Sequence, residues 1–88
     1  MTERIYHPNA YLKNFRNIEP GLRSRTAILN VLENTSADAK TISNRSELNY
    51  PVVLYHLRLL ESREIVERKG SRPYIWQLTG IGQRRLNN

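Results

Sequence analysis

The sequence predicts a small α+β fold, mainly helical, in which three helices are followed by a β-hairpin. Two observations indicate this. Apolar residues recur at helical spacing as far as residue 62, and two later runs instead have the residue types of β-strands. A connection that contains glycine and proline separates those two runs. From the length of 88 residues we expect one folded domain, 22–88, preceded by an N-terminal arm or helix, 1–21.

The N-terminal segment is bounded by His7-Pro8 and Pro20-Gly21; Pro8-Asn9 would start a helix and Pro20-Gly21 would stop it. The alternative is a flexible basic arm. Apolar residues stand at i, i+4, i+7 and i+11, so a helix would place them on one face. Because a domain this small is marginally stable, we expect this stripe to form a homodimer interface. Its members are Tyr11, Phe15, Ile18 and Leu22.

Two helices are predicted at the start of the main domain. The first covers Arg23–Asn34. Its apolar stripe consists of Ala27, Ile28, Val31 and Leu32. The second is short and ends near Arg45, and either Ser36 or Asp38 can cap it by accepting hydrogen bonds from its free N–H groups. Its apolar face consists of Ala39 and Ile42.

A longer third helix follows the tight turn at residues 46–49 and ends near Ser62. Pro51 lies in its first turn, where proline is tolerated because the N–H groups there have no partner within the helix. The buried stripe is predicted to be Val53, Leu57 and Leu60. The opposite side carries Pro51, Tyr55 and Arg58.

The remaining elements are a hairpin and a last helix. Ile65–Arg68 and Tyr74–Leu78 are the β-prone runs, joined by Lys69-Gly70-Ser71-Arg72-Pro73. Thr79 can cap a short helix from Gly80 to Leu86.

A short helix, a tight turn and a longer helix form a helix-turn-helix, and the hairpin makes it a winged helix-turn-helix with a three-helix core. Residues 24–86 resemble the winged helix-turn-helix DNA-binding regulators of the ArsR and MarR type. The resemblance is carried by Ile42–Glu61, Ile65–Arg68 and Arg72–Thr79.

These families usually have glycine in the turn between the two helices and again just before the first wing strand. Glycine adopts the left-handed backbone conformation there without a steric cost. This chain has Glu47 and Glu64 near those places. Either the turns have a different shape, or the left-handed conformation falls on Asn49 or Arg63.

The charge balance predicts an anionic partner. The net charge is +6, which implies nucleic acid or an acidic membrane surface. From Arg68 onward the chain has basic residues and no acidic one. The resemblance implies that the wing lies on phosphates or enters the minor groove, with Arg72 in the minor groove and Arg68 and Lys69 on phosphates. A charged hairpin tip can also be simply a solvated surface.

On the third helix, Arg58 is the candidate for a bidentate contact to guanine, or it pairs with Glu61. Tyr55 can contact a phosphate or a thymine methyl, or it packs against the wing. His56 borders the buried stripe and is interpreted as a core histidine. Phosphates also dock at helix N-termini. The predicted DNA-binding residues are Lys40, Thr41, Asn49, Tyr50, Val52, Tyr55, Arg58, Arg68, Lys69, Ser71 and Arg72.

Catalysis finds no support in the motifs. The chain has no cysteine, no glycine-rich phosphate loop and no recognisable carboxylate pair, and its two histidines lie in different segments. We therefore expect no enzyme, no cofactor and no metal site. We expect no membrane partner and a cytoplasmic, nucleoid-associated protein, because no apolar run approaches the ~20 residues of a membrane span and no signal peptide is recognisable.

The predicted function is that of a transcriptional regulator that binds double-stranded DNA, with the third helix in the major groove. One alternative is an architectural or genome-packaging protein that binds all duplexes alike through phosphates. Another is a winged-helix protein-interaction module, against which the net charge argues. RNA binding would be expected to expose more aromatic rings.

Overall fold

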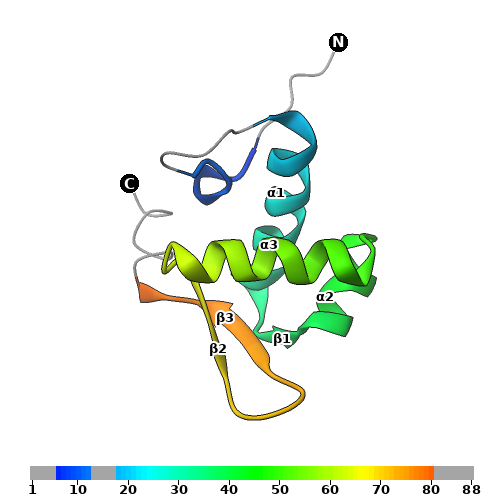
Figure 1. The fold of residues 1–88 in the computed structure, drawn as a ribbon, viewed down its shortest axis with the longest axis vertical. Coiled ribbons are helices and arrows are strands. Elements are labelled where there is room, and N and C mark those ends of the chain that lie inside the picture. Colours follow the sequence, from blue (N-terminus) through cyan, green and yellow to red (C-terminus); the bar gives the residue numbers. More distant parts are fainter. Residues whose placement is uncertain (1–5, 13–17, 81–88) are drawn as a thin grey trace.

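The computed structural model describes residues 6–12 and 18–80, and it confirms the predicted fold class. In these residues the chain forms three α-helices and a three-stranded antiparallel sheet; one strand follows the first α-helix and the other two follow the third (Figure 1). The elements are η1 (Pro8–Ala10), α1 (Glu19–Asn34), β1 (Ala37–Asp38), α2 (Ala39–Ser46), α3 (Tyr50–Ser62), β2 (Val66–Lys69) and β3 (Ile75–Leu78). Beyond Gly80, the predicted last helix lies outside the described residues.

The sheet has the strand order β1-β3-β2, and β1 is an addition to the predicted hairpin. Ala37 of β1 pairs with Trp76 of β3. In the hairpin, the register runs from Val66 opposite Leu78 to Lys69 opposite Ile75. The hairpin tip extends away from α1 (Figure 1), so it forms a wing beside α3.

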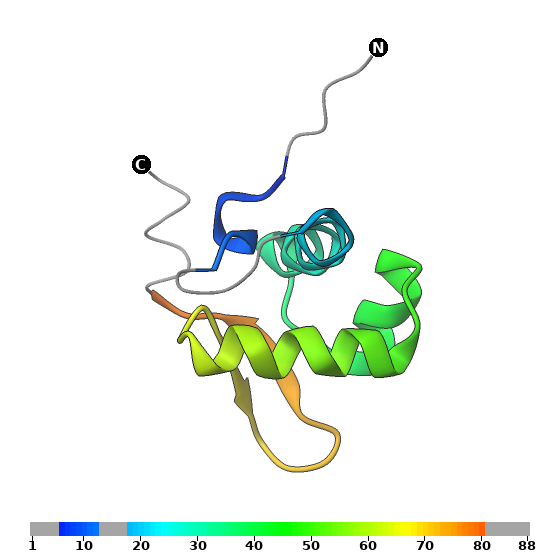
Figure 2. The same ribbon diagram turned by 45° about the horizontal axis from the view of Figure 1, so that its top comes forward.

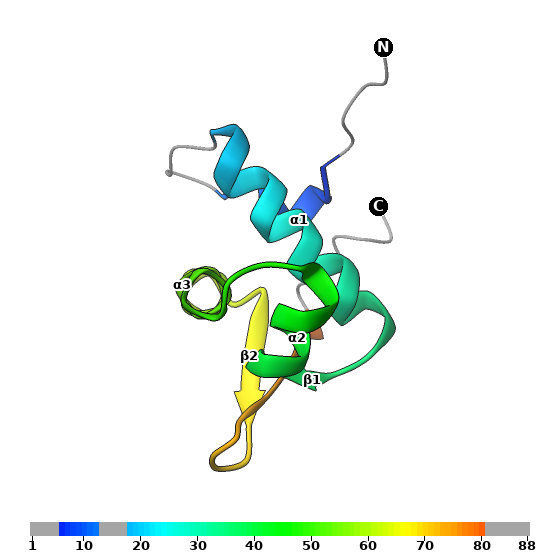
Figure 3. The same ribbon diagram turned by 90° about the vertical axis from the view of Figure 1, so that its right-hand side faces the viewer.

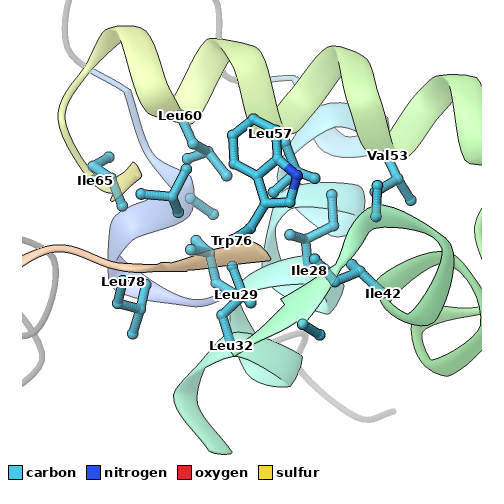
Figure 4. Close-up of a cluster of buried hydrophobic side chains, with 14 of the residues drawn as sticks. Ile28, Leu29, Leu32, Ile42, Val53, Leu57, Leu60, Ile65, Trp76 and Leu78 are labelled. Atoms are coloured by element: carbon cyan, nitrogen blue, oxygen red, sulfur yellow. The ribbon is translucent and has the colours of Figure 1, made fainter. Parts of the chain in front are cut away.

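Trp76 occupies the centre of the hydrophobic core, where helices and sheet meet (Figure 4). The predicted stripe of α3 is confirmed, because Val53, Leu57 and Leu60 are all fully buried. The predicted stripe of α1 is shifted. Its buried residues are Leu22, Arg25, Ile28, Leu29 and Leu32. Ala27 and Val31 are half-buried, so the core-facing side of this helix lies about one residue away from the predicted one.

The N-terminal segment packs against α1 in a way that the sequence did not indicate. Pro20 and Gly21 lie in the first turn of α1, so they start that helix and the expectation that they stop one is wrong. Proline suits a first turn because its missing N–H group would have had no partner there. Ala10 and Leu12 belong to the core, and η1 lies beside α1 (Figure 2).

The predicted apolar stripe of this segment is not a single helical face. Tyr11 and Ile18 have extended backbones outside the helices, and they are 47% and 56% exposed. Leu22 is buried in the core of the chain itself. Phe15 lies outside the described residues.

Two turns depart from the expectation that the left-handed conformation would move to a neighbouring residue. Glu47 ends α2 with φ 59°, and Glu64 precedes β2 with φ 62°. Asn49 and Arg63 have negative φ values. The glutamates therefore adopt the conformation themselves, at a cost of about 1–2 kcal/mol each relative to an unstrained backbone.

Candidate nucleic-acid interface

Hydrogen bonds define the start of α2 and the turn that joins α2 to α3. The Asp38 side chain accepts a hydrogen bond of 2.8 Å from the Thr41 N–H group, which confirms Asp38 as the cap of α2. This bond lowers the pKa of Asp38. Across the turn, the Ser43 hydroxyl donates a hydrogen bond to the Leu48 carbonyl at 2.5 Å, and the Leu48 N–H group donates one to the Ser43 carbonyl at 3.2 Å. The start of α3 is thereby fixed relative to α2.

A groove of about 570 Å³ separates α3 from the wing, and we call it the wing groove. Figure 3 looks along α3 and shows the hairpin extending past it. From α3 the groove is lined by Tyr50, Leu54 and Arg58. From the wing it is lined by Arg68, Arg72, Pro73, Tyr74 and Trp76. Three arginines therefore face one groove, beside two tyrosine rings.

These arginines differ in what holds them. Arg58 is exposed and makes no ion pair or hydrogen bond with any residue that the structure describes, so its predicted alternative partner, Glu61, is not used. Glu61 instead pairs with Arg68 at 3.2 Å. Arg72 is exposed near the hairpin tip and, within residues 6–12 and 18–80, is also without an ion pair.

Tyr55 lies on a neighbouring side of α3 and is 58% exposed. Its ring packs edge-on against His56 with centroids 5.0 Å apart, and it does not line the wing groove. It borders a second groove, which is mostly apolar. The second groove is lined by Pro51, Leu54, Tyr55, Arg58, Leu59 and Ser62. Arg58 borders both grooves.

The other predicted residues lie around these two grooves. Lys40 and Tyr50 line a third groove, between α2 and the wing, together with Asn44 and Pro73. Asn49, Lys69 and Ser71 are exposed, and Thr41 and Val52 are half-buried. Apart from Thr41 and Val52, the predicted residues are thus exposed.

Sequence reasoning missed Leu54, Asn44, Pro73 and Tyr74. Leu54 had a signal, because it stands one helical turn from both Tyr50 and Arg58. The wing residues had none, since their position depends on how the hairpin folds back toward α3.

His56 is buried, as predicted for a core histidine, but its Nδ1 atom has no hydrogen-bond partner among the described residues. Burial and, to a smaller extent, the nearby charge of Arg25 together lower the pKa of His56 to about 4. Arg25 is itself buried in α1, where its Nε donates to the Ala10 carbonyl at 2.6 Å. Desolvation lowers the pKa of Arg25.

Within the described parts of the chain, no group of three or more histidine, aspartate or glutamate residues is placed to hold a metal ion. In the same parts, no helix has the length and apolar character needed to cross a membrane.

Comparison with solved structures identifies the architecture. One neighbour is the Zalpha domain of PKZ from Carassius auratus, in complex with Z-DNA, with a TM-score of 0.61 and 26% identity over 65% of this chain and 94% of that domain. The fold is a winged helix. The second neighbour is ZitR from Lactococcus lactis, with a TM-score of 0.66 and 17% identity over 96% of this chain. The match covers 55% of ZitR, so the chain spans just over half of that protein. No protein-family model matches the chain, and no curated protein sequence matches it either.

Proposed function

We propose that this chain binds double-stranded DNA as a transcriptional regulator, with α3 in the major groove and the wing on phosphate or in the minor groove. The observation that carries the proposal is the wing groove, which places Arg58 and Arg72, both without a partner in the described chain, on either side of one accessible groove. A guanidinium held this way is available for a base edge or a phosphate. The DNA-bound state of the Zalpha domain supports the same kind of partner.

The residues divide into base-reading and backbone-binding groups. Arg58 is positioned to contact guanine, and Tyr55 to contact a phosphate or a thymine methyl. Arg72 and Lys69 bind the backbone or the minor groove from the wing. Lys40 and Asn49 lie near the N-termini of α2 and α3, where backbone N–H groups favour phosphate.

Sequence reading is favoured over architectural binding by the apolar second groove on α3. Apolar residues such as Pro51, Leu54 and Leu59 add nothing to binding that is purely electrostatic. They can, however, pack against the methyl group of thymine and so contribute to sequence reading. We also propose a homodimer in which Tyr11 and Ile18 contribute to the interface, because both are large, apolar and exposed outside the winged core.

A second candidate is recognition of left-handed duplexes. It is favoured by the likeness to the Zalpha domain, which was crystallised in complex with Z-DNA and of which the match covers 94%. In this case the shape of the backbone, rather than base edges, would select the partner.

The test is a binding selection from random B-form duplexes at moderate salt, run beside a brominated CG-repeat duplex that stays left-handed. A recovered motif supports the regulator, and equal binding of all B-form duplexes supports the architectural alternative. Preference for the left-handed duplex supports the second candidate. If no duplex binds, the proposed function is wrong.

A further inference from the structure

Arg68 is the arginine of the wing groove that the structure holds in place. Its Nε atom lies 3.2 Å from a carboxylate oxygen of Glu61, near the end of α3. Its guanidinium carbon lies 4.8 Å from the ring centroid of Tyr74 and 5.7 Å from that of Trp76. From its position on β2, the Arg68 side chain therefore contacts both α3 and the aromatic residues on the β3 side of the hairpin.

These contacts join the two walls of the wing groove. Tyr74 and Trp76 belong to the wing wall, and Glu61 lies on α3 three residues after Arg58. Trp76 pairs directly with Arg68 across the hairpin. The side chain of Arg68 thus forms a strut between helix and hairpin, supported by an ion pair and by cation–π contacts.

The charges argue against a phosphate contact for this residue. In the described chain Arg58 and Arg72 have no ion pair, whereas the carboxylate of Glu61 offsets the charge of Arg68. A phosphate that approached Arg68 would also approach that carboxylate. Binding it would require the guanidinium to give up an existing partner.

We propose that Arg68 is a positioning residue, which acts through Glu61 and Tyr74 to set the distance between α3 and the wing. This inference rests on the proposed function, because the wing then presents Arg72 and Lys69 to the same duplex that α3 reads. It has a consequence that simple electrostatics does not share. Removing the acidic Glu61 weakens DNA binding, although it makes the protein more positive.

The test compares Glu61→Ala with the matched control Glu47→Ala, using the selected duplex at fixed salt. Glu47 is exposed in the turn before α3 and has no ion pair in the described chain. We expect Glu61→Ala to weaken binding by up to about fivefold, the range of a partly exposed ion pair. Glu47→Ala should leave binding unchanged or strengthen it. Unchanged binding by Glu61→Ala would overturn the inference, and tighter binding would overturn it in favour of a phosphate contact by Arg68.

A double-mutant cycle with Arg68→Gln isolates the pair. If Glu61 acts through Arg68, the double variant should bind no more weakly than Arg68→Gln alone. If the double variant is weaker by the full factor of Glu61→Ala, the two residues act independently and the inference fails.

A fluorescence measurement without DNA tests whether the variants change the contact between α3 and the wing in the folded protein. Trp76 is the one tryptophan of the sequence, so its fluorescence reports on the strut directly. Acrylamide quenching should increase in Glu61→Ala and Arg68→Gln but not in Glu47→Ala, and equal quenching in all of them would contradict the inference. If the wild-type protein binds no duplex, the proposed function fails. If it binds and Glu61→Ala behaves like the wild type, the positioning role alone fails.

Discussion

Replacing Arg58 with alanine tests whether α3 reads the base edges of a duplex. The side chain borders both grooves of α3 and makes no described ion pair or hydrogen bond. Its removal opens no cavity in the core, so the free energy of unfolding should change by no more than about 0.5 kcal/mol. If Arg58 contacts a guanine edge, affinity for the preferred site should fall by about 1–3 kcal/mol, or about five- to 150-fold.

The assay is fluorescence anisotropy with the preferred and a scrambled duplex at several salt concentrations. Arg45→Ala is the matched control, because Arg45 is an exposed arginine that borders a different groove, between α1 and α2. We expect that control to bind nearly like the wild type at both duplexes.

Two results would refute parts of the reasoning. An equal loss on both duplexes, with the slope of log K against log salt reduced by about 0.9, would assign Arg58 to a phosphate instead of a base. Unchanged binding by a folded Arg58→Ala protein would mean that α3 is not the recognition helix.

Other perturbations test the wing, the buried histidine and the N-terminal segment. Replacing Lys69 and Arg72 together with alanine should weaken binding to all duplexes and reduce the salt slope by about 0.9 for each lost phosphate contact; an unchanged slope would place the wing off the DNA. The pKa of His56 is lowered to about 4 in the folded state, so the unfolded chain binds this proton more readily, and the free energy of unfolding should fall by about 2–3 kcal/mol as the pH drops from 6.5 to 4. Urea titrations should show a flatter pH dependence for His56→Gln, and identical pH profiles would contradict this. Replacing Tyr11 and Ile18 with serine should give a monomer in sedimentation without loss of the core, and an unchanged dimer would exclude these residues from the interface.

The fold could be predicted because its main helix has unambiguous signals. Pro51 in the first turn and the spacing of Val53, Leu57 and Leu60 determine the position and the buried face of α3. Strand β1 could not be predicted, since its two residues are too few for any periodicity and their partner strand, β3, lies far along the chain. Such a strand is specified by tertiary contacts rather than by local sequence.

The sequence indicated which residue types the candidate site contains, but not which of these residues form ion pairs with one another. The sequence identified Arg58 as a candidate on the third helix and Arg68 and Arg72 as candidates on the wing, yet it could not show that Glu61 pairs with Arg68. The burial of Arg25 could not be predicted for a similar reason. A charged residue on the core side of α1 contradicts the usual pattern, and its partner is a backbone carbonyl of the non-helical segment around Ala10.

The left-handed turns at Glu47 and Glu64 bracket α3 and affect how rigidly it is mounted. Glycine at either place would let the backbone sample several conformations, whereas a residue with a Cβ has a narrower range. The two glutamates therefore lower the stability of the fold but make the backbone at both ends of α3 more rigid. If α3 and the wing bind DNA as proposed, less conformational freedom is lost on binding, because part of that entropic cost is already met during folding.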